Sequence, residues 1–127
     1  MPKKILVVDD DTHVRILLEQ TLEVFEDAGV ELLLATDGRE AWDVIQAERP
    51  DVIILDVMMP EMSGYEVCER LRADPNCAHA HVIMLTAKGQ VKDHQRGLEV
   101  GANEYITKPF SPRRLVARVA EVLDVQL

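Results

Sequence analysis

The chain has 127 residues, of which 47% are apolar and 29% are charged, a composition typical of a folded globular protein and not of a disordered one. We expect residues 1–127 to form one domain around one hydrophobic core. The 14 basic and 23 acidic residues give a net charge of −9, which argues against direct binding to nucleic acids or anionic membranes. Because no apolar run is long enough to cross a membrane and the N-terminus lacks a signal-peptide pattern, we expect a cytoplasmic protein.

Short apolar runs alternate with amphipathic stretches along the chain. The runs ILVV, VIIL and VIML are apolar at every position, which is typical of strands that are covered on both faces of a sheet. Two further strands are expected from weaker signals, one between the first two of these runs and one after the last. The predicted strands are residues 5–8, 31–35, 52–55, 82–85 and 104–107.

Each strand is followed by a stretch with helical spacing of apolar residues. The fourth of these helices is expected at about residues 89–101. Side-chain caps, glycine and proline mark the ends of the others. The apolar face of the first helix consists of Val14, Leu17, Leu18, Leu22 and Phe25; the start and stop signals are Asp11, Gly29, Asp37 with Glu40, Pro50, Ser63 with Glu66, Asp74 with Pro75, and Ser111 with Pro112.

Five strand–helix repeats with short connections predict an α/β fold. Such connections allow only right-handed crossovers onto a parallel sheet, so the five strands are expected to be parallel. No linker or internal repeat indicates a second domain. In an open parallel sheet, ligands bind outside the carboxyl ends of the strands, so the residues at those ends are the candidate site.

Acids, a hydroxyl and an ammonium group stand at these strand ends. Asp9 and Asp10 follow the first strand, Asp56 the third and Thr86 the fourth, and Lys108 comes just after the fifth. Three carboxylates a few ångströms apart repel by roughly 1–4 kcal/mol per pair, so such a pocket raises a pKa or binds a cation. Hard oxygen ligands favour Mg²⁺, and a hydroxyl with an ammonium suits an arriving anion. The combination fits phosphoryl transfer.

Four motifs then indicate a family. LVVDDD, DVIILDVMMPEMSG, MLTA and GANEYITKPF occur in this order, and together they resemble the receiver domain of two-component response regulators over essentially all 127 residues. The resemblance implies a flavodoxin-like, doubly wound sheet of strand order 2-1-3-4-5 with five helices on its two faces.

The resemblance also implies which residues carry the chemistry. Asp56 would be the phosphoacceptor and would form an acyl phosphate. Asp10, Asp9, Asp56 and the backbone carbonyl of Met58 would hold Mg²⁺. Side chains two residues past the phosphoacceptor and two past the threonine, Met58 and Lys88, would control the access of water, and we expect slow spontaneous loss of the phosphoryl group.

The same resemblance implies a conformational switch. Thr86, helped by the Ala87 amide, would bind one phosphoryl oxygen, and Lys108 would pair with another. Tyr105 would turn inward as Thr86 is drawn to the phosphate. The Lys108–Pro109 peptide bond is expected to be cis, although few X-Pro bonds are.

Each of these residues also has an ordinary interpretation when it is considered alone. Thr86 would then cap a loop, Lys108 would be a solvated charge and Tyr105 a plain strand residue. Cys68 and Cys77 are expected to be reduced thiols without a special role. The remaining residues with possible ligand chemistry are expected at the surface: His13, His79, His81 and His94.

The predicted function is a phosphorylation-controlled switch that catalyses only its own phosphorylation and dephosphorylation. The expected partners are a histidine kinase or phosphotransfer protein, and an output domain or effector that contacts the helix at 89–101, the strand at 104–107 and the last helix. A homodimer formed on phosphorylation is left open. Two alternatives remain: a degenerate receiver that binds partners without phosphorylation, and a haloacid-dehalogenase-like phosphatase, whose DxDx[T/V] motif fails here at its fifth position, His13.

Overall fold

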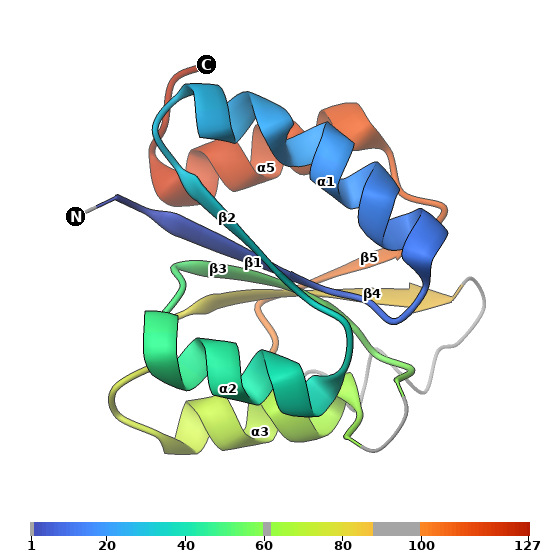
Figure 1. Ribbon diagram of the computed structural model, residues 1–127, viewed down its shortest axis with the longest axis vertical. Helices are drawn as coiled ribbons and strands as arrows, with labels where there is room; N and C mark the ends of the chain where they lie inside the picture. Colours follow the sequence, from blue (N-terminus) through green and yellow to red (C-terminus); the bar gives the residue numbers. More distant parts are fainter. Residues whose placement is uncertain (1, 60–61, 88–99) are drawn as a thin grey trace.

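A central parallel sheet organises the molecule, for which a computed structural model describes residues 2–59, 62–87 and 100–127. The strand order is β2-β1-β3-β4-β5, as the family resemblance implies, and all neighbours are parallel (Figure 1). The observed strands differ from the predicted ones by at most two residues at either end. They are β1 (Lys4–Val8), β2 (Glu31–Ala35), β3 (Val52–Asp56), β4 (His81–Ala87) and β5 (Glu104–Lys108).

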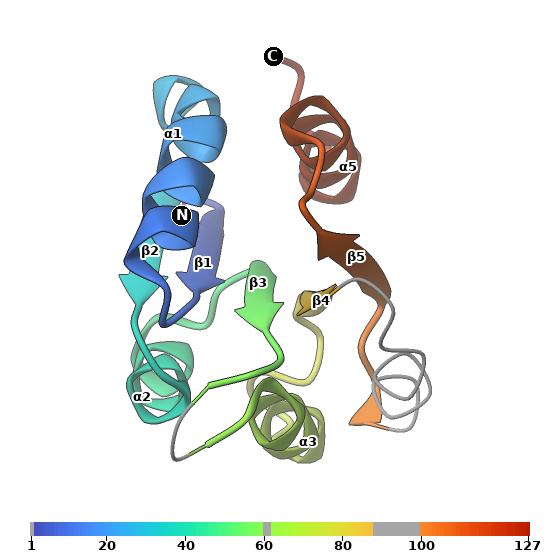
Figure 2. The ribbon, with the colours of Figure 1, turned by 90° about the vertical axis from the view of Figure 1, so that its right-hand side faces the viewer.

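Helices cover both faces of this sheet. Helices α1 (Thr12–Asp27) and α5 (Pro112–Leu123) lie on one face, and α2 (Gly38–Glu48) and α3 (Gly64–Ala73) lie on the other (Figure 2). The helix that the sequence predicts at about residues 89–101 lies almost entirely outside the described residues. None of the helices in the described parts of the chain is long and apolar enough to span a membrane.

The helix starts that the sequence predicts within the described residues are confirmed. Each described helix begins after a residue whose side chain accepts a hydrogen bond from a backbone N–H of the first turn, which would otherwise lack a partner. The α1 helix ends shortly before Gly29, whose φ of +88° is readily adopted by glycine only. The cap residues are Asp11, Asp37, Ser63 and Ser111.

The described side chains form two buried clusters, one on each face of the sheet, instead of the single core expected from the chain length. Successive residues of a strand point to opposite faces, so Leu6 of β1 joins the cluster under α2 and α3, whereas Ile5 joins the one under α1 and α5. One prediction for α1 is wrong, because Leu17 is 44% exposed and does not belong to the buried face. Cys68 and Cys77 are buried free thiols.

Candidate functional site

Three carboxylates meet at the carboxyl ends of β1 and β3. Asp9 and Asp10 directly follow β1, and Asp56 is the last residue of β3. One oxygen of each side chain lies within 4.8 Å of the others. Asp9 is fully buried and Asp56 nearly so, whereas Asp10 is exposed. The predicted cluster of acids is therefore present, and it has one side that is open to solvent.

Within the described parts of the chain, one ammonium group reaches this cluster, and it comes from the far edge of the sheet. Lys108 ends β5, and β4 lies between β5 and β3, so its side chain spans the width of one strand. Its Nζ lies 3.2 Å from Oδ1 of Asp56 and 3.3 Å from Oδ2 of Asp9. The other oxygen of Asp9 accepts a hydrogen bond of 2.9 Å from the amide of Asp11. The Lys108–Pro109 peptide bond that follows is cis, as expected.

The charges at the site are not balanced. Burial, and next the negative charge of Asp9, raise the pKa of Asp56 from 3.8 to about 7, even though Lys108 and a backbone hydrogen bond from Met58 act in the opposite direction. Burial by itself lowers the pKa of Lys108, but the charges of Asp56 and Asp9 outweigh that effect, and the pKa is raised. Among the residues that the structure describes, three acids face one ammonium group, so an added cation would relieve the repulsion. The all-oxygen donor set fits Mg²⁺.

A buried hydroxyl completes the inner part of the site. Thr86 of β4 is 1% exposed, and among the described residues its Oγ1 has no hydrogen-bond partner. Buried hydroxyls are normally paired, so this one is available to a ligand. Met58 stands on the outer side, two residues after Asp56, and is 65% exposed.

The comparisons with known proteins agree with this geometry. The model of the response regulator receiver domain family matches residues 5–120 of the chain. The chain belongs to this family. Receiver domains are signalling domains and not enzymes in the usual sense, and they generally bind Mg²⁺ at an acidic pocket.

Individual relatives of this receiver domain are themselves regulators. The domain is 48% identical to the phosphate regulon transcriptional regulatory protein PhoB of Pseudomonas aeruginosa, in a match that covers 95% of this chain and 52% of the relative. It is 46% identical to the alkaline phosphatase synthesis transcriptional regulatory protein PhoP of Bacillus subtilis, which covers 97% of this chain and 49% of the relative. The chain thus spans about half the length of these curated relatives.

A solved structure shows the same fold. The chemotaxis response regulator CheY4 of Vibrio cholerae superposes with a TM-score of 0.84 at 38% sequence identity, covering 96% of this chain and 99% of that one. The flavodoxin-like fold class that the motifs imply is therefore confirmed for this receiver domain.

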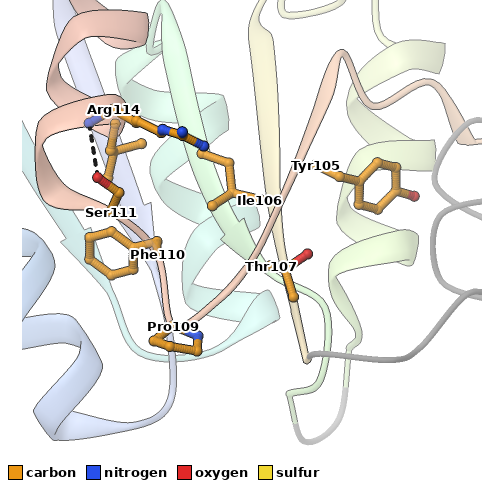
Figure 3. A pocket seen from close by; sticks show the side chains of 8 residues that line it. Tyr105, Ile106, Thr107, Pro109, Phe110, Ser111 and Arg114 are labelled. Carbon is orange, nitrogen blue, oxygen red and sulfur yellow. Dashed lines mark hydrogen bonds between the residues drawn. The ribbon is translucent and has the colours of Figure 1, made fainter.

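The switch candidate Tyr105 lies on β5, at the edge of the sheet. Its half-buried side chain packs against the cluster on the α2 and α3 face. A pocket of about 390 Å³ is lined by residues between 105 and 115, from β5 to the first turns of α5. Figure 3 shows Tyr105 directed to the opposite side of β5 from Ile106 and Phe110. The face that the sequence analysis assigned to an output partner is thus hollowed between β5 and α5, and its third predicted component, the helix at 89–101, lies outside the described residues.

One histidine prediction is wrong. His13 and His79 are exposed as expected, and His94 lies outside the described residues. His81, however, is the first residue of β4, is half-buried, and has its Nε2 2.5 Å from a carboxylate oxygen of Glu104. Arg118 of α5 binds the other oxygen of Glu104 at 2.5 Å. Burial raises the pKa of Glu104, but these two hydrogen bonds outweigh it and hold the pKa below its ordinary value.

The sequence analysis also missed a structural arginine. Arg72 of α3 donates hydrogen bonds of 2.5 to 2.8 Å to four oxygen atoms. The acceptors are the carbonyls of Ala78, Ala80 and Gly101 and the side chain of Asn103, which precedes β5. No motif marks it, because its partners come from two separate segments, one just after α3 and one distant in the chain.

Proposed function

We propose that Asp56 accepts a phosphoryl group from a histidine kinase or phosphotransfer protein in a Mg²⁺-dependent reaction. The observation that carries this proposal is the position of its carboxylate, which lies 3.2 Å from the Lys108 ammonium and clusters with the acids Asp9 and Asp10. Membership of the receiver family supports the same reaction class. The domain changes only its own phosphorylation state and turns over no separate substrate.

The chain's own residues would act as follows. An ionised oxygen of Asp56 attacks phosphorus; the oxygen–phosphorus bond forms as the bond from phosphorus to the donor's imidazole nitrogen breaks, and the donor leaves as neutral histidine after it takes up a proton. Mg²⁺ held by Asp9, Asp10, Asp56 and the Met58 carbonyl would neutralise charge on the transferring group. Lys108 would donate a hydrogen bond to one phosphoryl oxygen, because its ammonium already lies beside the carboxylate of Asp56.

The hydroxyl of Thr86, which has no hydrogen-bond partner among the described residues, would bind a second phosphoryl oxygen. Binding of this oxygen would draw the carboxyl end of β4 toward Asp56, and Tyr105 on the neighbouring strand would then pack further inward. The surface between β5 and α5 would change as a result, and an output domain or effector would read that change. Because two relatives are transcriptional regulators, we propose that the output is transcription, in the cytoplasm, with a homodimer as one form of the phosphorylated state.

The test uses a small-molecule phosphoryl donor. The wild type, Asp56→Asn and Asp10→Ala are incubated with phosphoramidate and Mg²⁺, and the intact mass of each is measured. We expect one added phosphoryl group on the wild type and none on either variant. Equal modification of wild type and Asp56→Asn would refute the assignment of Asp56.

Further outcomes separate this function from its two alternatives and test the metal ligands. A degenerate receiver would stay unmodified in the wild type as well. A phosphatase of the haloacid dehalogenase type would hydrolyse p-nitrophenyl phosphate over many turnovers, which we do not expect. Wild-type Mg²⁺ affinity in Asp10→Ala, measured by calorimetry, would show that the metal ligands are assigned wrongly.

A further inference from the structure

Two glycines allow unusually close backbone contacts around the segment that follows Asp56. Gly64 is the first residue of α3, and a Cβ there would lie 2.4 Å from the carbonyl oxygen of Asp56. Gly38 is the first residue of α2, and a Cβ there would lie 2.1 Å from the carbonyl oxygen of Met62 and 2.9 Å from its carbonyl carbon. Atoms at these distances overlap, so any other residue at either position must displace backbone.

Hydrogen bonds fix the start of the same segment. The amide of Val57 donates to the carbonyl of Leu85 in β4 at 3.2 Å, and the amide of Gly64 donates to the carbonyl of Val57 at 3.0 Å. Further along the chain, Met62 lies so close to Gly38 that a Cβ on Gly38 would overlap its carbonyl oxygen. Met58 lies between Val57 and Met62 in the sequence, and its backbone carbonyl is the proposed Mg²⁺ ligand.

The N-terminus of α2 is itself firmly placed, so it does not yield easily. The side chain of Asp37 accepts a hydrogen bond of 2.8 Å from the amide of Glu40, and Thr36 donates one of 3.0 Å to the carboxylate of Glu40. The carbonyl of Ala35 accepts a hydrogen bond of 3.3 Å from the amide of Asp9. The segment that leads into Gly38 is thereby hydrogen-bonded to the backbone of Asp9, which belongs to the acidic cluster.

Helix propensity does not explain a glycine at this position. Glycine is less favourable than alanine by roughly 0.5–1 kcal/mol in a helix interior, and no local helix preference favours it at the first helical position, which Gly38 occupies. The close approach of Met62 explains it instead. The two explanations predict opposite effects of Gly38→Ala, which makes the contact testable.

We propose that Gly38 and Gly64 are positioning residues for the metal site. They touch neither Mg²⁺ nor the phosphoryl group; Gly64 sets the place of the backbone at Asp56 and Val57, and Gly38 that of Met62, so that the Met58 carbonyl can join the carboxylates as a ligand. This inference rests on the proposed function, because it concerns the same site. Substitution moves the Met58 carbonyl and weakens Mg²⁺ binding, while the carboxylates themselves remain.

The experiment measures Mg²⁺ affinity by calorimetry for the wild type, Gly38→Ala and Gly64→Ala. We expect a loss of about 10-fold or more in both variants, as is usual when a residue that supports a metal ligand is changed. The phosphorylation rate with phosphoramidate should fall at low Mg²⁺ and recover at saturating Mg²⁺, because the defect is in binding.

Gly29→Ala is the matched control. It makes the same chemical change at a position where a Cβ meets nothing within 4 Å but where φ is +88°, so it costs stability away from the site. We expect a lower Tm and an unchanged Mg²⁺ affinity. A merely structural role of Gly38 and Gly64 would make all three variants behave like this control.

Wild-type Mg²⁺ affinity in folded Gly38→Ala and Gly64→Ala overturns the inference. Trimethylamine N-oxide is added to every sample so that weakened variants stay folded, which circular dichroism verifies; if Gly38→Ala still does not fold, Gly64→Ala decides. A wild type that neither binds Mg²⁺ nor becomes phosphorylated contradicts the proposed function. Normal wild-type binding with unaffected variants contradicts only the positioning role.

Discussion

The ammonium of Lys108 lies 3.2 Å from Oδ1 of Asp56, although the two residues end strands that are not neighbours in the sheet. The pairing is incomplete, since the same ammonium lies 3.3 Å from Asp9, and the pKa of Asp56 remains raised to about 7 by burial and by Asp9. Lys108 therefore limits the repulsion between the carboxylates without removing it.

Lys108→Met should raise the pKa of Asp56 further, because it removes the attraction and the hydrogen bond that lower it. The measurement is a titration of the Asp56 carboxyl carbon by NMR in metal-free buffer. Lys4→Met is the control, since Lys4 pairs with Glu48 near the opposite ends of the strands and should leave this pKa unchanged. An unchanged or lower pKa in Lys108→Met contradicts the pairing.

Asp56→Asn should stabilise the metal-free protein at pH 8 but not at pH 4. The pKa of Asp56 is about 7 in the folded chain against an ordinary value of 3.8, so the folded state binds the proton more tightly. Protonation of Asp56 therefore contributes to the free energy of unfolding at low pH, and this contribution is lost as pH rises from about 4 to about 7. Asparagine has no such dependence.

The test is thermal unfolding of both proteins in EDTA across this pH range. We expect a Tm difference of about 10 °C or more at pH 8 that shrinks to nothing near pH 4. A Tm difference that is constant with pH, or largest at low pH, would show that folding does not raise the pKa of Asp56.

Thr86→Val should raise the free energy of unfolding by about 1 kcal/mol in the unphosphorylated protein, because it replaces a buried hydroxyl without a described partner by a methyl group of the same shape. The same change should slow phosphorylation of Asp56. Urea denaturation measures the first effect and intact mass the second. Thr107→Val, at the exposed register partner of Thr86, should change stability by less than about 0.5 kcal/mol. A marked destabilisation by Thr86→Val would mean that the hydroxyl is satisfied.

Met58→Asn should speed the spontaneous loss of the phosphoryl group. Hydrolysis needs a water molecule in line with the phosphorus–oxygen bond, and the exposed thioether of Met58 cannot orient it, whereas an amide can. The decay of phospho-Asp56 is followed on phosphate-affinity gels. Met58→Leu keeps an apolar side chain and should decay like the wild type; equal rates for Asn and Leu would contradict the role of Met58. Lys88, the second expected control point, lies outside the described residues.

The sequence predicted the strands and the acidic edge well because both depend on local patterns. Runs such as VIIL are apolar at every position, which favours burial on both faces of a sheet, and these residues are buried. Parallel strands bring Asp9 and Asp56 to the same edge. The caps Asp37 and Ser63 were equally predictable, since each bonds within its own first turn.

The errors and omissions concern contacts between distant segments. His81 pairs with Glu104 because β4 and β5 align Ile83 with Glu104, and nothing in the sequence fixes that register. Leu17 has helical spacing but lies at the border of the buried face, where period alone does not decide exposure. The close approach of Gly38 to Met62 brings the first residue of α2 next to the segment before α3, and no local pattern indicates such a contact.

Successive residues of β1 point to opposite faces of the sheet, so this strand contributes side chains to both clusters. Leu6 and Val8 belong to one cluster, and Ile5 and Val7 belong to the other. Neither half can come apart while the other stays intact, because each would have to give up the same strand. The backbone amides of β1 should therefore exchange with deuterated solvent only when the whole domain opens, so their exchange rate directly reports the global free energy of unfolding.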